Sequence, residues 1–327
     1  MLTRALRWTV AAVAAFAMAA CGSNTAASPS ATDLSTAAAA TRTVTSTFTG
    51  KQVEIPTNPQ RVLALWRVGS ELADLGVVPV AALEGELLES ELGADVYAKV
   101  KDVPTVGTYE GVDIQKVIAA KPDLIIGMDN SGLKIDYDEL SEVAPTVILK
   151  IAEPTDVWDN YPTVADLVAK STDFETRNAA IDKQLAEVKT KHGDVLGKLQ
   201  VTAFSGSEDG LWVNTSKSLT YRRLNAAGFG YNPTYTDNPQ RFVTALALEN
   251  LPDLGKQDAL LYETAFTGTV PDVTQTVLDA ASFKALQATK AGLALPIGSG
   301  TVYTLAAAQK QADDIKAAAE KIVAAKG

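Results

Sequence analysis

The segment Thr172–His192, "TDFETRNAAIDKQLAEVKTKH", decides the fold, because it is typical of one long helix between two regions of a different kind. Phe174, Leu185 and Val188 fall on a single apolar stripe of that helix, as in a helix packed along one side. About twenty helical residues extend roughly 30 Å, enough to cross a small domain. We therefore interpret this helix as a rigid connector between two lobes.

Short buried strands alternate with short helices on both sides of the connector. The runs "RVLALW" (61–66) and "KPDLIIG" (121–127) precede it, and "VTAFSG" (201–206) and "DALLYET" (258–264) follow it. This alternation indicates an α/β fold, and a hairpin at 48–55 is expected to open the first lobe. The predicted boundaries are 48–154 for the N-terminal lobe, 155–195 for the connecting helices and 196–327 for the C-terminal lobe.

The start of the chain is typical of an exported lipoprotein. Two arginines precede an apolar run over 10–20, which is short for a membrane span and ends in "MAAC" at Cys21, the one cysteine of the sequence. Because "MAAC" resembles a lipobox, we expect residues 1–20 to be a signal peptide and Cys21 to carry the lipid. The Ala/Ser/Thr-rich residues 21–47 are predicted to be a flexible spacer. The expected location is the extracytoplasmic face of the cell membrane.

Charge and residue counts exclude several classes of function. The formal net charge is -10, and it becomes -12 once the two arginines of residues 1–20 are removed, so nucleic acid is not an expected partner. One histidine and one cysteine cannot build a multi-histidine zinc site or the usual hydrolytic triads. We expect His192 to lie at the C-terminal end of the connector helix, where the helix dipole favours it. Neither an enzyme nor a resident metal or cofactor is predicted.

Ordered sequence blocks from about Phe48 onward carry a family resemblance. "GKQVEIPTNPQRVLAL", "VPTVGTYEGVDIQKVIAAKPDLIIG" and "LENLPDLGKQDALLY" resemble the iron–siderophore substrate-binding proteins of ABC importers. The resemblance implies the class III periplasmic-binding-protein fold, with two α/β lobes, a long joining helix and a ligand cleft between the lobes. It also implies a monomer that captures a ferric siderophore of hydroxamate, citrate or mixed type. The implied partners are a membrane permease and its ATPase.

The family docks on its permease through one glutamate on each lobe. Glu249 of "LENLPDL" stands at the matching position of the second lobe. In the first lobe the sequence has Gln115, with Asp113 two residues earlier, so the usual charged contact is replaced by an uncharged amide.

A cleft for a ferric chelate needs aromatic faces and a few cations, since the iron arrives already coordinated. Candidates should lie where strands end and loops begin, and one of Arg222 and Arg223 should face the cleft. Trp158 on the connector is interpreted as core. The predicted ligand-binding residues are Trp66, Arg67, Tyr109, Asn130, Trp212, Tyr221, Arg222, Arg223, Arg241, Phe242 and Tyr303.

Other functions stay open at this point. The same fold binds haem and cobalamin, and tyrosines are the available axial ligands for a haem. An esterase that opens the siderophore would need a nucleophile and a base, and the sequence lacks a G-x-S-x-G motif. A surface lipoprotein without a transport role is the remaining alternative.

Overall fold

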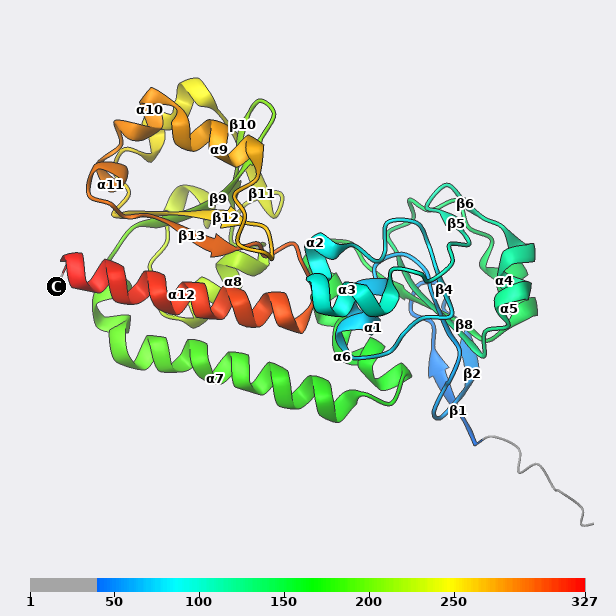
Figure 1. Cartoon of the computed structure of the whole chain (residues 1–327). Helices are drawn as coiled ribbons and strands as arrows, with labels where there is room; N and C mark the ends of the chain where they lie inside the picture. The colour runs from blue at the N-terminus through cyan, green and yellow to red at the C-terminus, as the bar shows by residue number, and fades with distance from the viewer. Residues whose placement is uncertain (1–39, 327) are drawn as a thin grey trace, which may run out of the picture. The chain divides into compact units, whose positions relative to one another are not determined.

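The computed structural model describes residues 40–326, which belong to one compact unit. Two sheets in this unit are separated along the chain by the consecutive helices α6 (Thr155–Leu167) and α7 (Ser171–Leu196) (Figure 1). The first is four-stranded and parallel, in the order β4-β3-β7-β8. The second is mixed, in the order β11-β10-β9-β12-β13, with β9, β12 and β13 parallel. This is the predicted two-lobed α/β fold with a long joining helix.

The first lobe contains two small antiparallel hairpins beside its sheet. Its strands are β1 (Thr41–Thr45), β2 (Gln52–Pro56), β3 (Val62–Ala64), β4 (Ala81–Ala82), β5 (Gly107–Thr108), β6 (Gly111–Val112), β7 (Leu124–Asp129) and β8 (Thr146–Lys150). Its helices are α1 (Gly69–Asp74), α2 (Glu89–Leu92), α3 (Ala94–Val100), α4 (Ile114–Ala120) and α5 (Tyr137–Val143).

Helices cover both faces of the second sheet, with α9, α10 and α11 on one side and α12 on the other (Figure 1). The strands are β9 (Val201–Ser207), β10 (Gly210–Asn214), β11 (Val243–Ala247), β12 (Ala259–Thr264) and β13 (Ala294–Gly298). The helices are α8 (Leu219–Ala226), η1 (Pro233–Tyr235), η2 (Leu248–Leu254), α9 (Asp272–Asp279), α10 (Ala281–Lys284), α11 (Gln287–Lys290) and α12 (Leu305–Lys326).

Local sequence explains the short α4–β7 unit of the first lobe. The Asp113 side chain accepts hydrogen bonds from the backbone N–H groups of Gln115 and Lys116, which caps the start of α4. Lys121 then adopts φ 48° and ends the helix just before Pro122. All of β7 is buried, as expected for a central parallel strand covered on both faces.

Two boundaries differ from the sequence prediction. β1 lies inside the stretch predicted to be spacer, and it pairs with β2 from Thr41 opposite Pro56 to Thr45 opposite Gln52. The hairpin is therefore longer than 48–55. Exposed threonines alternate in β1 with half-buried Arg42 and Val44, as in a strand that packs on one face.

The connector helix also runs further than predicted. α7 continues through Gly193 to Leu196, so His192 lies within the helix and the predicted capping role is wrong. Gly193 is about 1 kcal/mol less favourable than alanine inside a helix, yet the helix continues to Leu196, which is fully buried.

α12 packs along α7, although the two helices are far apart in the sequence (Figure 1). Gln184 on α7 is hydrogen-bonded to Asp313 and Gln309 of α12, at 2.8 Å in each case. A single cluster of buried apolar side chains runs from the first sheet through α6, α7 and α12 to the second sheet, including Tyr161 and Ile315. The lobes thus share one continuous core.

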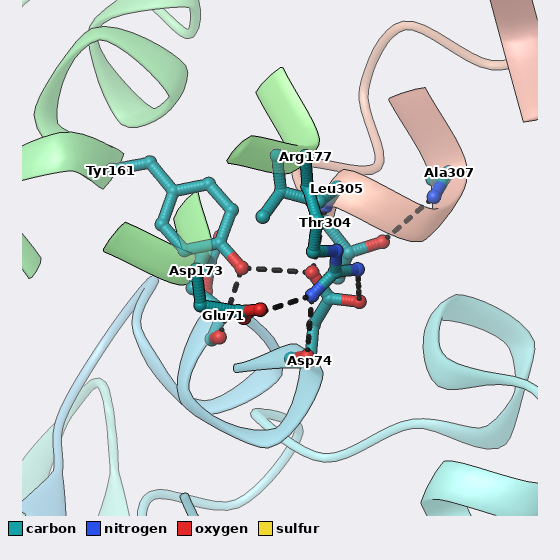
Figure 2. Close-up of polar contacts among 8 residues, drawn as sticks. All are labelled: Glu71, Asp74, Tyr161, Asp173, Arg177, Thr304, Leu305 and Ala307. Atoms are coloured by element: carbon teal, nitrogen blue, oxygen red, sulfur yellow. Dashed lines mark hydrogen bonds and ion pairs between the residues drawn. The ribbon is translucent and has the colours of Figure 1, made fainter. Parts of the chain in front are cut away.

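Asp74, at the end of α1, joins four helices (Figure 2). One carboxylate oxygen accepts hydrogen bonds from the Tyr161 hydroxyl (2.9 Å) and the Leu305 backbone N–H (2.8 Å). The other pairs with the Arg177 guanidinium of α7 at 2.8 Å, and Arg177 also donates to the Asp74 carbonyl oxygen. The Asp74 side chain is 5% exposed. We call this group, Asp74 with Tyr161, Arg177 and Leu305, the Asp74 hub.

Candidate ligand-binding site

A pocket of about 330 Å³ opens on the second lobe, by the carboxyl ends of its parallel strands. Trp212 of β10, Phe242 ahead of β11 and Glu263 of β12 line it, together with Thr301 just beyond β13. Ligands of open α/β sheets usually bind at this strand end. The volume lies at the lower end of the range of small-molecule sites, which is about 300–1,000 Å³.

Strand alternation and small neighbours place Trp212 at this pocket. Leu211 and Val213 point into the core, so Trp212 between them points to the opposite face and is 40% exposed. Its partners on the adjacent strands are Ser205 and Ala245. Because both partners are small, the face of the indole is left open to a ligand.

Arg241 and Phe242 reach the same pocket from the segment before β11. Their carbonyl oxygens accept hydrogen bonds from Thr215, whose hydroxyl donates to Arg241 (2.6 Å) and whose N–H donates to Phe242 (3.0 Å). The Arg241 side chain forms no ion pair with any residue between 40 and 326. A free guanidinium beside two aromatic rings can bind ligand oxygens and stack against a flat group.

Glu263 forms the floor of the pocket, at 5% exposure. Its carboxylate accepts hydrogen bonds from the Asn214 amide nitrogen (3.1 Å), the Thr220 hydroxyl, the Ser299 hydroxyl (3.0 Å) and the Gly300 N–H (3.4 Å). Four donors compensate the burial of this charge.

On the first lobe, Trp66 and Arg67 follow β3 and meet a residue of the second. The Arg67 guanidinium lies 5.1 Å from the Trp66 ring centroid and 5.9 Å from that of Tyr303. Arg67 has φ 65°, a left-handed conformation that is uncommon outside glycine and often marks a functional site. Burial raises the pKa of Tyr303 to about 12, so its hydroxyl stays protonated.

Glu86 lies directly beneath this turn. Its carboxylate accepts hydrogen bonds from the N–H groups of Val68 (3.2 Å) and Gly69 (3.1 Å) at the start of α1. A Cβ on Gly69 would lie 2.6 Å from the Glu86 Cβ, so only glycine permits this approach. Burial raises the pKa of Glu86 from 4.5 to about 7, against the opposing effect of these backbone donors and of Arg67.

Tyr109 and Asn130 lie on two neighbouring loops of the first lobe. Tyr109 is 59% exposed, and its carbonyl oxygen accepts a hydrogen bond from the Lys134 N–H at 3.3 Å. The Asn130 side chain accepts one from the Gly132 N–H at 2.9 Å. Both residues are exposed, and neither lines the second-lobe pocket.

Arg222 and Arg223, of which one was expected to face the cleft, do not line the pocket. Arg222 is exposed and forms a bidentate ion pair with Asp159 of α6. Arg223 is 5% exposed, donates to the Gln311 side chain of α12 at 2.6 Å and lies 4.7 Å above the Trp158 ring. Both guanidinium groups are therefore used to join α8 to neighbouring helices.

Tyr221, from the same cluster, also stays outside the pocket. Its ring packs edge-to-face on Tyr231, with centroids 5.1 Å apart. Trp158 packs against Tyr161 and Phe174 at the connector, in line with its interpretation as core.

The two residues assigned to docking are both exposed. Glu249 lies in the first turn of η2, immediately after β11, and is not part of the pocket lining. Gln115 lies in the first turn of α4, where its N–H is bound by the Asp113 side chain. Asp113 is thus occupied as a helix cap.

The remaining predictions concern lipidation, membrane-spanning segments and metal binding. Cys21, assigned to lipidation, lies outside the described residues. Within 40–326 no helix is both long and apolar enough to cross a membrane. The same residues contain no group of three or more histidine, cysteine or acidic side chains arranged to hold a metal ion.

Two α/β lobes, a long joining helix and a pocket at the strand ends are the architecture of class III periplasmic binding proteins. Residues 74–292 match the family model described as periplasmic binding protein, and the chain belongs to that family.

Several proteins are similar to this chain. A probable siderophore-binding lipoprotein of Bacillus subtilis, YfiY, is 33% identical over 183 residues, covering 54% of each chain. The iron(3+)-hydroxamate-binding protein FhuD of the same organism is 28% identical over 251 residues, covering 72% of this chain and 73% of that one. The chain spans about half the length of the first curated relatives it matches.

The fold is also found among solved structures. The siderophore periplasmic binding protein from the fuscachelin gene cluster of Thermobifida fusca superposes with a TM-score of 0.73 at 21% identity. The superposition covers 82% of this chain and 98% of that one. At this identity the likeness establishes the architecture alone.

Sequence reasoning missed three residues that shape the site, namely Glu263, Asn214 and Glu86. The sequence did contain a signal for Glu263. It is an acidic residue near the end of the apolar strand "DALLYET", and burying a carboxylate is unfavourable unless polar partners surround it. Glu86 lies in a loop with no pattern of its own, and only the three-dimensional structure shows that it faces the start of α1.

Proposed function

We propose that this protein is the substrate-binding component of an ABC importer, and that it captures a ferric siderophore and delivers it to a membrane permease. The observation that carries the proposal is the second-lobe pocket, where Trp212 and Phe242 offer apolar faces and Arg241 a free guanidinium. Ferric chelates combine apolar linkers with an oxygen-rich metal centre, and such a pocket suits both.

The iron would arrive as part of the ligand, already coordinated by the siderophore. The protein then needs to supply no metal ligand, and no cofactor is proposed. Trp66, Arg67 and Tyr303 are proposed to complete the site from the side of the first lobe, because their stack joins the two lobes. Tyr109 and Asn130 are proposed to contact bulkier ligands from the same side.

No catalytic step is proposed. The family is one of binding proteins, and the single histidine of the sequence lies on α7 rather than at the pocket. The role is capture and delivery, carried out by a monomer anchored at the extracytoplasmic face of the membrane through Cys21.

The test is a titration of the soluble protein, from residue 22 onward, with a panel of ferric siderophores, haem and cobalamin, followed by tryptophan fluorescence. A ferric siderophore should quench the fluorescence and bind with sub-millimolar affinity. Arg241→Ala should weaken binding about tenfold or more, the cost of one charge-assisted hydrogen bond. Arg222→Ala is the matched control, since it removes an arginine that lies outside the pocket.

Two results would contradict the proposal. If haem or cobalamin bound tightly and no ferric siderophore did, the natural ligand would belong to another chemical class. Loss of affinity in Arg222→Ala but not in Arg241→Ala would place the site elsewhere.

Anchoring needs a separate experiment on the full chain in cells. Cys21→Ser should abolish labelling by a fatty-acid probe and release the protein from the membrane fraction. Retention of both label and membrane association in that variant would exclude Cys21 as the anchor.

A further inference from the structure

Few cations are left free around the pocket. Arg222 is paired with Asp159, and Arg223 is buried between Gln311 and Trp158. Of the second-lobe arginines predicted for the site, only Arg241 lines the pocket, and it is exposed to solvent. Salt and water screen an exposed charge strongly, so its attraction for a distant anion is weak.

The buried charged side chain that lines the pocket is negative, whereas the buried Arg223 lies outside the lining. Glu263 lines the floor at 5% exposure, and a charge buried in protein is screened much less than one on the surface. Any excess negative charge brought into the pocket would be repelled by this carboxylate. The turn from β9 to β10 adds Glu208 and Asp209, which line the adjoining groove on the other side of Trp212.

Glu263 also accepts hydrogen bonds from two other side chains of the pocket lining. The Asn214 amide nitrogen and the Ser299 hydroxyl both donate to its carboxylate. The Asn214 amide nitrogen keeps a second N–H, whereas the Ser299 hydroxyl oxygen also accepts a hydrogen bond from the Thr301 N–H at 3.2 Å. Part of the donor capacity closest to the buried carboxylate is therefore already used by Glu263 itself.

We infer that Glu263 makes this pocket selective by charge, favouring ferric chelates that are neutral or carry a free ammonium over polyanionic ones. This inference rests on the proposed function and deepens it. A ferric trihydroxamate is neutral at its metal centre, and a pendant ammonium adds a positive charge that the buried Glu263 carboxylate attracts. A ferric tris-catecholate is a trianion, which the buried carboxylate repels.

The experiment compares three probes on the soluble protein from residue 22 onward. They are a ferric linear trihydroxamate with a free ammonium, the same chelate with that amine acetylated, and a ferric tris-catecholate. The wild-type protein should bind both trihydroxamates at least about tenfold more tightly than the trianion. Acetylation removes the positive charge at the cost of one small added group, so the ammonium form should bind more tightly than the acetylated form.

Glu263→Gln keeps the size of the side chain and one acceptor oxygen while removing the charge. Its affinity for the trianion should rise about tenfold relative to that for the acetylated trihydroxamate, and the advantage of the ammonium should disappear. Glu187→Gln is the matched control, because it removes one negative charge from an exposed position on α7. It should leave all three affinities unchanged.

A second variant guards against a folding defect in Glu263→Gln. Thr301→Lys adds a cation at an exposed position of the pocket lining and should raise the affinity for the trianion. Equal preference ratios in the wild type, Glu263→Gln and Thr301→Lys would overturn the inference while leaving siderophore binding intact. Absence of binding by every probe would instead overturn the proposed function.

Discussion

Glu86 illustrates how one side chain is tuned by its place in the fold. Its carboxylate is buried against the first N–H groups of α1, and burial outweighs their stabilising hydrogen bonds. The pKa therefore rises to about 7, within the range where small changes of pH alter its charge. The nearby Arg67 guanidinium lowers the pKa of Glu86. The carboxylates of Glu86 and of the buried Glu71 on α1 repel each other, which has the opposite effect.

The raised pKa of Glu86 predicts a specific pH dependence of stability. Because the folded state holds this proton more tightly than the unfolded state, the contribution is fully present below about pH 4.5 and is lost as the pH rises through about 7. The full span corresponds to about 3 kcal/mol in the free energy of unfolding. Urea unfolding at several pH values should show this loss, and Glu86→Gln should reduce it.

The control for this prediction is Glu89→Gln, which removes an exposed carboxylate on α2. It should keep the wild-type slope of stability against pH. If Glu86→Gln kept that slope as well, another group would be responsible.

Prediction from sequence worked best for side chains whose position follows from strand geometry. Trp212 lies on a strand and Arg241 and Phe242 immediately before one, and the structure brings these three together. It failed for Arg222 and Arg223, because helical neighbours point in different directions and their partners, Asp159 and Gln311, are distant in the sequence. Such pairings have no local signal.

At the scale of elements, the Asp74 hub is where α1, α6, α7 and α12 meet (Figure 2). Its carboxylate accepts hydrogen bonds from residues of three other helices and is almost completely buried. Thr304 adds a cap to α12, since its hydroxyl accepts from the Ala307 N–H at 3.1 Å. These contacts hold the start of α12 against the first lobe.

Asp74→Asn should lower the free energy of unfolding by about 3 kcal/mol, because it leaves Arg177 without its charged partner and replaces an acceptor with a donor. The measurement is urea unfolding, with hydrogen exchange at Leu305 as a local readout. Asp173→Asn is the control, since Asp173 lies 3.6 Å from Arg177 and is largely exposed. It should cost less than about 0.5 kcal/mol.

A faster exchange at Leu305 with unchanged global stability would show that the hub holds α12 locally. Unchanged exchange and unchanged stability in Asp74→Asn would contradict the role assigned to it.

The connector helix was predictable from its apolar stripe, whereas the pairing of α12 with α7 was not. Periodicity shows which face of a helix is apolar, but it does not identify which other helix packs against that face. The strand β1 was missed for a different reason. Its Ala/Thr-rich surroundings are typical of a spacer, and a strand of five residues has too weak a pattern to overcome that composition.

At the scale of the whole molecule, delivery to a permease should be separable from ligand binding. Glu249 is exposed on η2 and absent from the pocket lining, so Glu249→Ala should bind the ferric siderophore normally and fail to support uptake into cells. The loss should be large, because the first lobe offers the uncharged Gln115 at the corresponding position. Uptake and affinity are measured side by side.

Asp253→Ala provides the comparison, since Asp253 is an exposed acid on the same short helix as Glu249. It should retain uptake. A fall in chelate affinity in Glu249→Ala, with transport per bound ligand unchanged, would assign Glu249 to the binding site.

The position of α12 in the chain has a consequence for biosynthesis. α12 follows all the other described helices and strands, yet it supplies Gln311 to Arg223 and Thr220, and the Leu305 N–H to Asp74. While the ribosome is still making residues 305–326, these buried polar groups of the first and second lobes lack the partners that α12 supplies. A chain released or cut before α12 should therefore remain sensitive to proteases. Molecules able to bind the ligand should form only after the ribosome has completed this helix.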